Sequence, residues 1–493
     1  MENLLDTQEK RSLLFLRTLY NNERWFTEKE LSKIGNCSSD ATYRTLNLLR
    51  QIKYDQNDSL EIISKKNKGF FLQATPLHSI GETESLFIKD TISYRLIDLI
   101  FHEQGFTLVD LAEIFYVSTS TIYRRLKNLA DYFSENGLSL NMNNFVISGP
   151  EHIIREFFYR FYWSVIKSSQ WPFKTISFEE TLNLYNEKMN ALSFQLTDTE
   201  RLQFLYRLAI NQIRYQHHHF IDIAPNKDII DPYIERYSQY TKQFITEDIP
   251  IAFHINEWTF LSLILISNPV FDELHSDYEL KVNWHKEKRT SAYLFAISLI
   301  HAYKIRNEKL IFKDETKLIF RLLSSYTYTI AFSELTIHHL NVKNMLLSVS
   351  ELNYSFFEQS QLIMESILHL FPKNRNHFDQ DYLLYNIILT ISSSLKLKEL
   401  RKEIFVKLIC TVEPLSEEYL SQKLIKFSNH NLVVHTGTNE QSHDGYYDLL
   451  LSDFHFDDHI YPHASKTYIW DFLPNERDWK NIFALIDSIA NED

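Results

Sequence analysis

Cysteine and glycine are scarce in this chain of 493 residues, which contains 2 cysteines and 8 glycines. Cys37 and Cys410 lie far apart in the sequence, and no spacing typical of a metal site is present. We therefore expect both thiols to be small core residues, and we expect no metal and no other cofactor. The low glycine content, together with 36 phenylalanines and 28 tyrosines, favours a helix-rich protein with tight aromatic packing.

Long apolar runs are also missing. Stretches such as residues 260–266 are much shorter than the roughly 18 apolar residues that a transmembrane helix needs. Charged residues, among them Glu2, Asp6 and Glu9, interrupt the N-terminal segment and set it apart from a signal peptide. We therefore expect a soluble, cytoplasmic protein without a membrane partner.

A strong positive charge is absent even from the N-terminal part. Residues 1–150 contain 17 Lys and Arg against 19 Asp and Glu, a net charge of −2. Non-specific affinity for nucleic acid should be modest, because it depends on the number of phosphates neutralised. Residues 401–493 contain 8 Lys and Arg against 16 Asp and Glu, which gives −8 of the formal net charge of −13. This acidic region repels DNA and suits regulation or subunit contacts.

The chain does contain one 24-residue unit twice, at residues 26–49 and 106–129, offset by 80 positions without a gap. Nine positions are identical in the two copies: Phe26/Phe106, Thr27/Thr107, Leu31/Leu111, Ile34/Ile114, Ser38/Ser118, Tyr43/Tyr123, Arg44/Arg124, Leu46/Leu126 and Leu49/Leu129. In each copy a threonine suited to cap a helix opens a short amphipathic segment. A three-residue turn follows, and a serine is placed to cap a second helix. This order predicts tandem helix-turn-helix units.

The second helix of each copy has the two faces that a DNA-reading helix needs. In the second copy one apolar stripe faces a core, and it consists of Ile122, Leu126, Leu129 and Phe133. The opposite face offers hydroxyl and cationic groups to phosphates and base edges. In the first copy the outward set includes Asp40, which would repel phosphate. The second copy is therefore the better candidate.

A strand-like segment follows each helix pair and predicts a wing. Residues 61–73 lead into a basic turn, with Gly69 available for a positive φ. Residues 138–149 form two alternating runs around Asn143 and Asn144, which favour a hairpin. The side chains that we expect to contact DNA are Tyr43, Arg44, Asn47, Lys65, Lys66, Lys68, Ser118, Thr119, Ser120, Tyr123, Arg124 and Lys127. The alternative is that these helices only pack against protein partners.

The middle of the chain, about residues 165–395, is predicted to be nearly continuous amphipathic helix with polar breaks at 224–231, 268–277 and 372–379. Within it, DTERLQF at 198–204 aligns with DETKLIF at 314–320, an offset of 116. Histidines follow both segments at two comparable places: His217, His218, His219 and His254 in the first, and His338, His339 and His369 in the second. These spacings fit two helical modules.

The histidines allow three interpretations. Three consecutive histidines on a helix point in different directions and lack a carboxylate or fourth ligand, which disfavours a metal site. Ordinary surface or packing roles need no further explanation. As phosphoacceptors, imidazole nitrogens are competent nucleophiles, and an added phosphoryl group can shift a two-state packing. Spacing alone does not choose among these roles.

Over essentially its full length the chain resembles the Mga and AtxA class of virulence regulators of Gram-positive bacteria. The segments that carry the resemblance are FTEKELSKI with TYRTLNLL, FTLVDLAEIFYVSTSTIYRRLKNL, LNMNNFVISGPEHIIREFF and RLAINQIRYQHHHF. In this class the helical modules are phosphotransferase-system regulation domains (PRDs). The resemblance therefore implies a transcriptional activator that a phosphocarrier protein adjusts by transient histidine phosphorylation.

The C-terminal segment alternates short apolar runs with helical stretches, which is typical of a small open α/β domain with a mostly parallel sheet. The runs lie at 404–410, 431–436, 446–453 and 466–470. This domain resembles the phosphotransferase EIIB-like domain of the same regulators, whose working members carry a phosphorylated cysteine in the loop after the first strand. We place Cys410 inside that strand, which argues against phosphoryl transfer and favours a retained fold used for regulation or oligomerisation.

The sequence therefore predicts a mainly α, multidomain DNA-binding transcriptional regulator. We expect winged helix-turn-helix domains at 1–77 and 78–162, PRD-like helical modules at 163–288 and 289–397, and an EIIB-like α/β domain at 398–493. Its partners would be double-stranded DNA and further copies in a homodimer or larger homo-oligomer, and it would not be an enzyme. Two alternatives are a PRD-type RNA-binding antiterminator, which needs a small β-rich N-terminal domain, and a phosphotransferase-system component, which needs a reactive residue in a transfer loop.

Overall fold

In the computed structural model the chain forms two compact units. One unit consists of residues 1–297, 319–347 and 366–385, and the other of residues 298–318, 348–365 and 386–493. The structure describes residues 4–50, 60–74, 80–166, 171–190, 196–222, 238, 240–267, 278–306, 312, 314–336, 342–352, 354–371, 379–394, 403–411, 414–436, 446–454, 464–470 and 473–490.

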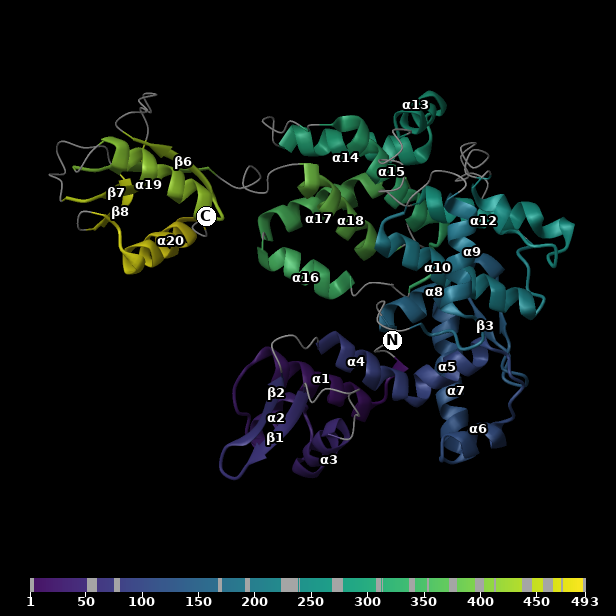
Figure 1. Cartoon of the computed structure of the whole chain (residues 1–493). Coiled ribbons are helices and arrows are strands. Elements are labelled where there is room, and N and C mark those ends of the chain that lie inside the picture. Colours follow the sequence, from purple (N-terminus) through teal and green to yellow (C-terminus); the bar gives the residue numbers. More distant parts are fainter. Residues whose placement is uncertain are drawn as a thin grey trace. The chain divides into compact units, whose positions relative to one another are not determined.

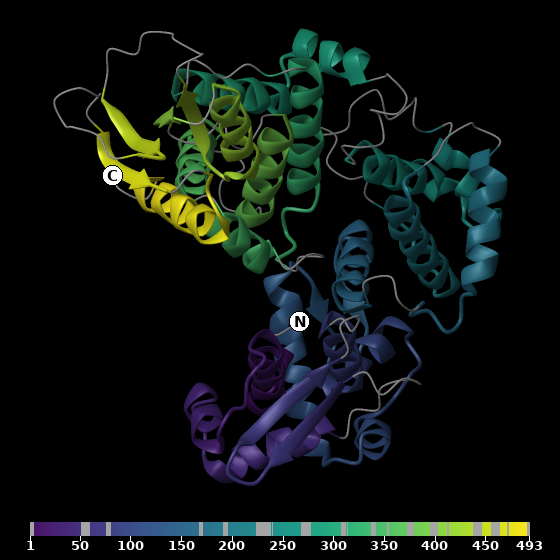
Figure 2. The ribbon, with the colours of Figure 1, turned by 60° about the vertical axis from the view of Figure 1, so that its left-hand side comes forward.

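The first predicted helix-turn-helix is present and carries a wing. Its elements are α1 (Thr7–Asn21), α2 (Glu28–Ile34), α3 (Ser39–Arg50), β1 (Leu60–Lys65) and β2 (Gly69–Ala74). The two strands form an antiparallel hairpin beside these helices (Figures 1 and 2). Gly69 has a φ of 97°, and a Cβ there would lie 2.0 Å from the carbonyl oxygen of Phe26. Only glycine therefore allows β2 to approach the chain before α2.

The second helix-turn-helix follows the same plan. Its elements are α4 (Ile80–Asp90), α5 (Ile92–Phe101), α6 (Leu108–Ile114), α7 (Thr119–Glu135), β3 (Ser139–Leu140) and β4 (Ile147–Ser148). The predicted stripe is confirmed, since Ile122, Leu126, Leu129 and Phe133 are all buried. The second wing is shorter than expected. Its antiparallel strands pair at only two positions, because Asn141 and Asn144 bond their side chains to the turn backbone instead.

Helix α8 (Glu151–Ile166) connects the second wing to the helical region. Five of its aromatic side chains are almost completely buried: Phe157, Phe158, Tyr159, Phe161 and Tyr162. The Phe158 ring lies 4.3 Å from the ring of Phe101 on α5, and the Phe157 ring lies 5.1 Å from that of Phe133 on α7. The helix-turn-helix core and the core of the following helices are therefore continuous.

The middle of the chain is helical, as predicted. The helices of this region are α9 (Phe178–Asn190), α10 (Asp198–Gln216), η2 (Lys242–Phe244), η3 (Ile251–Phe253), α12 (His254–Ile266), α13 (Tyr278–Lys288), α14 (Ser291–Arg306), α15 (Glu315–Ala331), α16 (Val342–Leu352), α17 (Tyr354–Leu368) and α18 (Gln380–Ser394). The predicted breaks at 224–231 and 268–277, and all but the last residue of the break at 372–379, lie outside the described residues.

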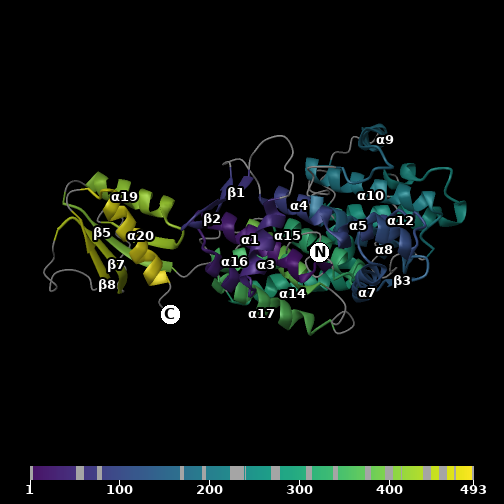
Figure 3. The ribbon, with the colours of Figure 1, turned by 90° about the horizontal axis from the view of Figure 1, so that it is seen from below.

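The predicted parallel sheet near the C-terminus is confirmed. Its strands are β5 (Glu403–Ile409), β6 (Asn431–His435), β7 (Tyr447–Ser452) and β8 (Ala464–Ile469), in the order β6-β5-β7-β8, and every pair is parallel. Helices α19 (Pro414–Phe427) and α20 (Glu476–Ala490) join the same apolar core on one face of the sheet (Figure 3). This is a two-layer α/β arrangement.

The position predicted for Cys410 inside the first strand is wrong. Strand β5 ends at Ile409, which pairs with Ser452, the last residue of β7. The backbone N–H of Cys410 donates instead to Glu417 Oε1 on α19, at 3.0 Å. Because its N–H has left the ladder, Cys410 is the first residue of the loop after β5.

Candidate DNA-binding surface and histidine segment

Side-chain caps fix the ends of the helix-turn-helix elements. The Thr107 hydroxyl accepts from the backbone N–H of Asp110 at 3.2 Å, and the Asp110 carboxylate accepts from the backbone N–H of Thr107 at 2.8 Å. These hydrogen bonds from Thr107 lower the pKa of the Asp110 carboxyl. Thr27 and Glu30 form the same capping box in the first copy. Ser118 caps α7 by accepting from Thr121. The predicted caps are confirmed.

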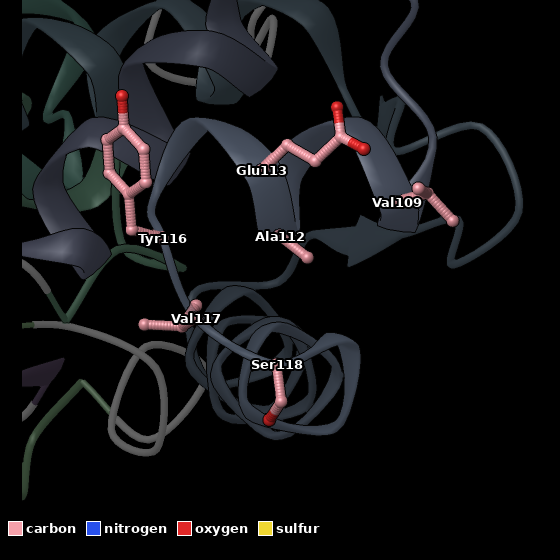
Figure 4. Close-up of a pocket in the computed structure, with 6 residues that line it drawn as sticks. All are labelled: Val109, Ala112, Glu113, Tyr116, Val117 and Ser118. Atoms are coloured by element: carbon pink, nitrogen blue, oxygen red, sulfur yellow. The ribbon is translucent and has the colours of Figure 1, made fainter.

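The outward face of α7 is open to solvent. Ser118, Thr119, Ser120, Tyr123, Arg124 and Lys127 are all exposed, and Tyr123 keeps 53% of its surface accessible. Ser118 lies at the start of this helix, next to the turn that follows α6 (Figure 4). The helix therefore presents hydroxyls, a phenol, a guanidinium and an ammonium side by side, which is the chemistry that contacts phosphates and base edges.

The corresponding face of α3 is exposed in the same way. Tyr43, Arg44 and Asn47 are exposed, and the Tyr43 ring contacts the edge of Phe70 in the wing at 5.8 Å. Arg44 Nε donates to the carbonyl oxygen of Asp40 at 3.4 Å, and the Asp40 side chain is exposed at the start of α3. The first copy thus places a negative charge where the second copy has a hydroxyl, so its attraction for phosphate is weaker.

The wing lysines Lys65, Lys66 and Lys68 are exposed around the β1–β2 turn. Asn67 makes this turn with a φ of 68°, a conformation that asparagine tolerates better than most residues. Lys65 Nζ lies 5.6 Å from the centre of the Trp25 ring, which is a cation–π contact. The wing is therefore a cluster of positive charge at the tip of a paired hairpin.

Arg125 is a buried, ion-paired residue whose structural role sequence reasoning missed. It is buried, and it donates to Asp6 at 2.6 Å and to Glu9 at 3.3 Å, which joins α7 to the start of α1. Arg17 and Glu84 form a second pair between the two winged units at 2.6 Å. These pairs connect the helices of the two winged units to each other. Arg125 lies three residues after Ile122, and a cation on an apolar stripe is the signal that it needs a buried partner.

A hollow of about 430 Å³ lies beside the turn of the second helix-turn-helix. Figure 4 shows Val109 and Glu113 on α6 and Tyr116 and Val117 in the turn that line it. Tyr116 is 95% exposed and has a φ of 52°. A tyrosine pays a conformational cost in this left-handed region without gaining a buried contact.

A network of buried charges surrounds α8, and sequence analysis did not predict it. Arg155 donates to Glu257 on α12 at 2.6 and 3.0 Å and to Glu151 at 3.0 Å. Arg214 on α10 donates to Glu151 at 2.9 and 2.8 Å. Burial acts to raise the pKa of the Glu151 carboxyl, but the two guanidinium groups outweigh it and hold that pKa below its usual value. Each charge is therefore paired.

The histidine triplet lies at the end of a helix, not within one as predicted. Helix α10 ends at Gln216, His217 is its C-cap, and His218 turns the chain with a φ of 59°. The N–H groups of all three histidines bond to the last carbonyls of the helix, which closes it. His219 Nε2 donates to Glu103 Oε1 at 2.7 Å, and Arg214 donates to the same oxygen at 2.9 Å. Glu103 lies two residues after the end of α5, so the triplet contacts the second winged domain.

The structure brings His254 near this triplet segment. Phe253, next to His254, stacks on Phe220 at 5.1 Å, and the Asn256 amide donates to the carbonyl of Ile221 at 3.0 Å. The ring of His254 donates to the carbonyl oxygen of Ile249 at 2.7 Å. His369 is exposed after α17, whereas His338 and His339 lie outside the described residues.

The surroundings of Cys410 disfavour a thiolate. Burial and the charges of Asp453 and Glu417 raise the pKa of this thiol to about 12. The thiol is therefore a poor nucleophile although it does lie in the loop after the first strand. In the described parts of the chain, no three His, Cys, Asp or Glu side chains gather as a metal site would require. No described helix is long and apolar enough to cross a membrane.

Comparison with known proteins supports the helix-turn-helix assignment of the second winged domain. Residues 77–162 match the family model of the Mga helix-turn-helix domain. The chain is similar to the capsule synthesis positive regulator AcpB of Bacillus anthracis, with 20% identity over 97% of this chain and 98% of AcpB. It is also similar to the capsule synthesis positive regulator AcpA of the same organism, with 28% identity over 42% of this chain and 43% of AcpA. The chain therefore contains an Mga helix-turn-helix domain at residues 77–162, and over almost its whole length it is similar to a Mga-like positive regulator.

Proposed function

We propose that the chain activates transcription by binding double-stranded DNA through α7, α3 and the wing lysines. The observation that carries this proposal is the exposed polar face of α7 inside the matched domain. Tyr123, Arg124 and Lys127 share that face, while the opposite face is buried. Both similar proteins are named positive regulators, which supports activation. The site of action is the DNA of the cell, and hence the cytoplasm.

A gel-shift titration on the chain's own promoter region tests this proposal. Arg124→Ala should cost about 1 to 3 kcal/mol if the guanidinium reads a base, and adding Lys127→Ala should weaken all sequences alike. The matched control is Arg477→Ala with Lys480→Ala, which removes the same charge from exposed positions on α20. Unchanged affinity in the α7 variant, with its circular dichroism intact, excludes this surface as the DNA contact.

Assembly into a homodimer or larger homo-oligomer belongs to the same proposal. The first 150 residues have no excess of positive charge, so a single copy has few phosphate contacts. Two copies on one DNA site add their contacts through a high effective concentration. The C-terminal sheet and α19 would serve such regulation as a retained EIIB-like domain, because the Cys410 thiol is chemically unsuited to phosphoryl transfer.

Regulation is proposed to act through histidine phosphorylation in two PRD-like modules, at residues 163–288 and 289–397. What supports it is the contact of His219 with Glu103, because a modified histidine there adjoins the DNA-binding domain. The phosphate source would be the phosphocarrier protein of the phosphotransferase system, a transient partner. The acceptor candidates are His217, His218, His219, His254, His338, His339 and His369.

In vitro phosphorylation with purified carrier proteins and labelled phosphoenolpyruvate tests this regulation. An acid-labile label should enter the wild-type chain and should be lost when the true acceptor is replaced by alanine. Aspartate at that position should shift oligomeric state or transcription toward the modified form. Absence of label in the wild type, or label that persists when all seven histidines are replaced, rules the mechanism out.

A further inference from the structure

The two copies of the duplicated unit differ on the outward side of their first helix and the turn after it. Residues that fold the unit are shared and buried, as are Leu31 and its counterpart Leu111. Four outward positions, offset by 80 residues, have changed chemistry: Lys29/Val109, Glu30/Asp110, Lys33/Glu113 and Asn36/Tyr116. Their formal charge is +1 in the first copy, from two lysines and one glutamate, and −2 in the second, from one aspartate and one glutamate. The α6 side therefore repels phosphate, whereas the α2 side attracts it.

The outward side of α6 also carries the apolar hollow of about 430 Å³. Val109 is 57% exposed and Tyr116 is 95% exposed, and both line this hollow together with Ala112 and Val117 (Figure 4). Apolar side chains that gather at one exposed place mark an interaction site, unlike those scattered singly. The first copy has Asn36 at the position of Tyr116, with a φ of 44°, which asparagine tolerates. The second copy thus places an aromatic ring in solvent where the backbone favours asparagine.

The charge beside the hollow is negative. Glu113 is exposed, and it is the only charged side chain among the described residues that line the hollow. Asp110, one turn earlier, is also exposed, and its hydrogen bonds from Thr107 lower the pKa of its carboxyl, so it is an anion at neutral pH. The guanidinium of Arg95 on α5 lies 4.7 Å from the centre of the Phe115 ring, and Arg95 does not line the hollow. A partner for this surface should therefore be cationic.

Arginine fits these groups better than a small cation does. Its guanidinium forms paired hydrogen bonds with a carboxylate and stacks its plane on an aromatic ring, and Glu113 and Tyr116 supply both beside one hollow. Its aliphatic stem is suited to the valine and alanine side chains that line the rest of the surface. The chemistry of the hollow therefore points to an arginine in a protein segment.

The hollow adjoins the DNA-binding surface. Ser118 lines the hollow and also caps α7, whose outward face carries the proposed DNA contacts. A protein that occupies DNA next to this chain can therefore reach α6 while α7 stays on the DNA. For an activator, the protein to be held on neighbouring DNA is RNA polymerase. Because both would be bound to one DNA molecule, even a weak contact between them gains from a high effective concentration.

We propose that the hollow on α6 binds an arginine-bearing segment of RNA polymerase, with the guanidinium between the Glu113 carboxylate and the Tyr116 ring. This inference rests on the proposed function, since it requires a chain that binds a promoter and raises transcription. It separates two tasks within one helix-turn-helix: α7 contacts DNA, and α6 with its turn contacts the polymerase.

Two measurements on the full chain test this separation. Gel shift measures promoter binding, and run-off transcription with purified RNA polymerase holoenzyme measures activation at concentrations that saturate the promoter. The test variant is Glu113→Lys with Tyr116→Asn, which introduces the residues of the first copy and is therefore compatible with the fold. Its DNA affinity should stay within about threefold of wild type, because α7 is unchanged. Its activation should fall at least about tenfold, because the carboxylate and the ring are both lost.

Matched variants assign the effect to this surface. Glu187→Lys reverses the charge of an exposed glutamate in the last turn of α9 and should leave DNA binding and activation unchanged. Tyr116→Phe keeps the ring and should retain activation within about threefold, because stacking of a guanidinium does not need the hydroxyl. A photoreactive Tyr116→p-benzoylphenylalanine variant, irradiated on promoter DNA with the holoenzyme, should label a polymerase peptide that contains arginine.

Several results would overturn the inference. Wild-type activation by Glu113→Lys with Tyr116→Asn on saturated DNA makes it wrong while the proposed function stands. A loss of DNA affinity that accounts for the lost activation assigns the face to DNA, and photo-labelling of a second copy instead of polymerase assigns it to self-association. A wild-type chain that binds no promoter DNA or raises no transcription contradicts the proposed function itself, and the inference is then wrong as well.

Discussion

The pair formed by Arg155 and Glu257 offers the sharpest test of how the helical region is held together. Glu257 is 0% exposed, and it accepts from Arg155 at 2.6 and 3.0 Å, from the Tyr215 hydroxyl at 2.7 Å and from the Ile221 backbone at 2.8 Å. The substitution Glu257→Gln keeps the shape of the side chain but removes its charge. It leaves the Arg155 guanidinium buried with one anionic partner fewer.

The expected loss of stability depends on the hydrogen-bond partners that Arg155 retains in this variant. Removing one partner of a buried ion pair costs roughly 3 to 5 kcal/mol, because the other charge stays desolvated. Arg155 still has Glu151 at 3.0 Å and the His219 carbonyl at 3.0 Å. We therefore expect Glu257→Gln to lower the free energy of unfolding of this region by about 3 kcal/mol, the lower end of that range. Because Glu151 also accepts a hydrogen bond from Arg214, it cannot fully replace the negative charge that Arg155 loses.

Native-state hydrogen exchange is the suitable assay, because a multidomain chain does not unfold in one step. Amide protection in α8 and α12 should fall by about a hundredfold in Glu257→Gln, at roughly 1.4 kcal/mol for each factor of ten. A double-mutant cycle with Arg155→Met should show a coupling of about 2 kcal/mol or more. Effects of the two substitutions that add within about 0.5 kcal/mol would refute the reasoning.

Four further predictions concern separate features. Replacing the wing lysines with glutamine should lower DNA affinity most at low salt and reduce the slope of log K against log salt by about 2 to 3, without loss of discrimination between target and random DNA. Tyr116→Asn should raise stability by about 1 kcal/mol in thermal melting, because asparagine tolerates a positive φ better. Cys410 should react with iodoacetamide roughly a thousandfold more slowly than a cysteine of ordinary pKa, because its own is about 12. Burial lowers the pKa of the His152 imidazole to about 4, so its contribution to stability should be complete above pH 6.5 and be lost as pH falls toward 4, and His152→Gln should remove this dependence in pH-resolved melting curves.

The local features of the winged domains were predictable from sequence. Helix caps, turns and apolar stripes depend on residues three or four positions apart, and the duplication showed the caps and the turn twice. Thr107 with Asp110 and the stripe from Ile122 to Phe133 are examples, and both are present in the structure. The parallel C-terminal sheet was predictable for a similar reason, since buried parallel strands are short continuous apolar runs.

Long-range charge pairing was not predictable. Arg125 meets Asp6 across 119 positions, and Arg155 meets Glu257 across 102. The periodicity of a helix shows that a charged residue falls on its buried face, but it does not identify the residue that pairs with that charge. The position of Cys410 was misjudged for a related reason. The end of β5 is set by the last pairing partner on β7 and by Glu417 on α19, and neither is visible in the run of apolar residues itself.

The contacts of the histidine triplet distinguish between the three histidines, which the spacing in the sequence could not do. His218 is exposed in a left-handed turn, where a carrier protein has access to it, but among the described residues its backbone hydrogen bond closes the turn and none reaches the second winged domain. His219 is half-buried, and its Nε2 is bonded to Glu103. Burial acts to raise the pKa of the Glu103 carboxyl, yet the His219 bond and the Arg214 charge lower it overall, so this group is an anion at neutral pH.

A phosphoryl group on Nε2 of His219 would therefore replace a hydrogen bond by repulsion between two anions. Arg214, 2.9 Å from Glu103, would then have two anionic groups competing for it. The connection after α5 would lose its tie to α10, and that connection leads directly into the second helix-turn-helix. Modification of His219 thus has a direct physical route to the second winged domain, because its ring is hydrogen-bonded to a residue of that domain.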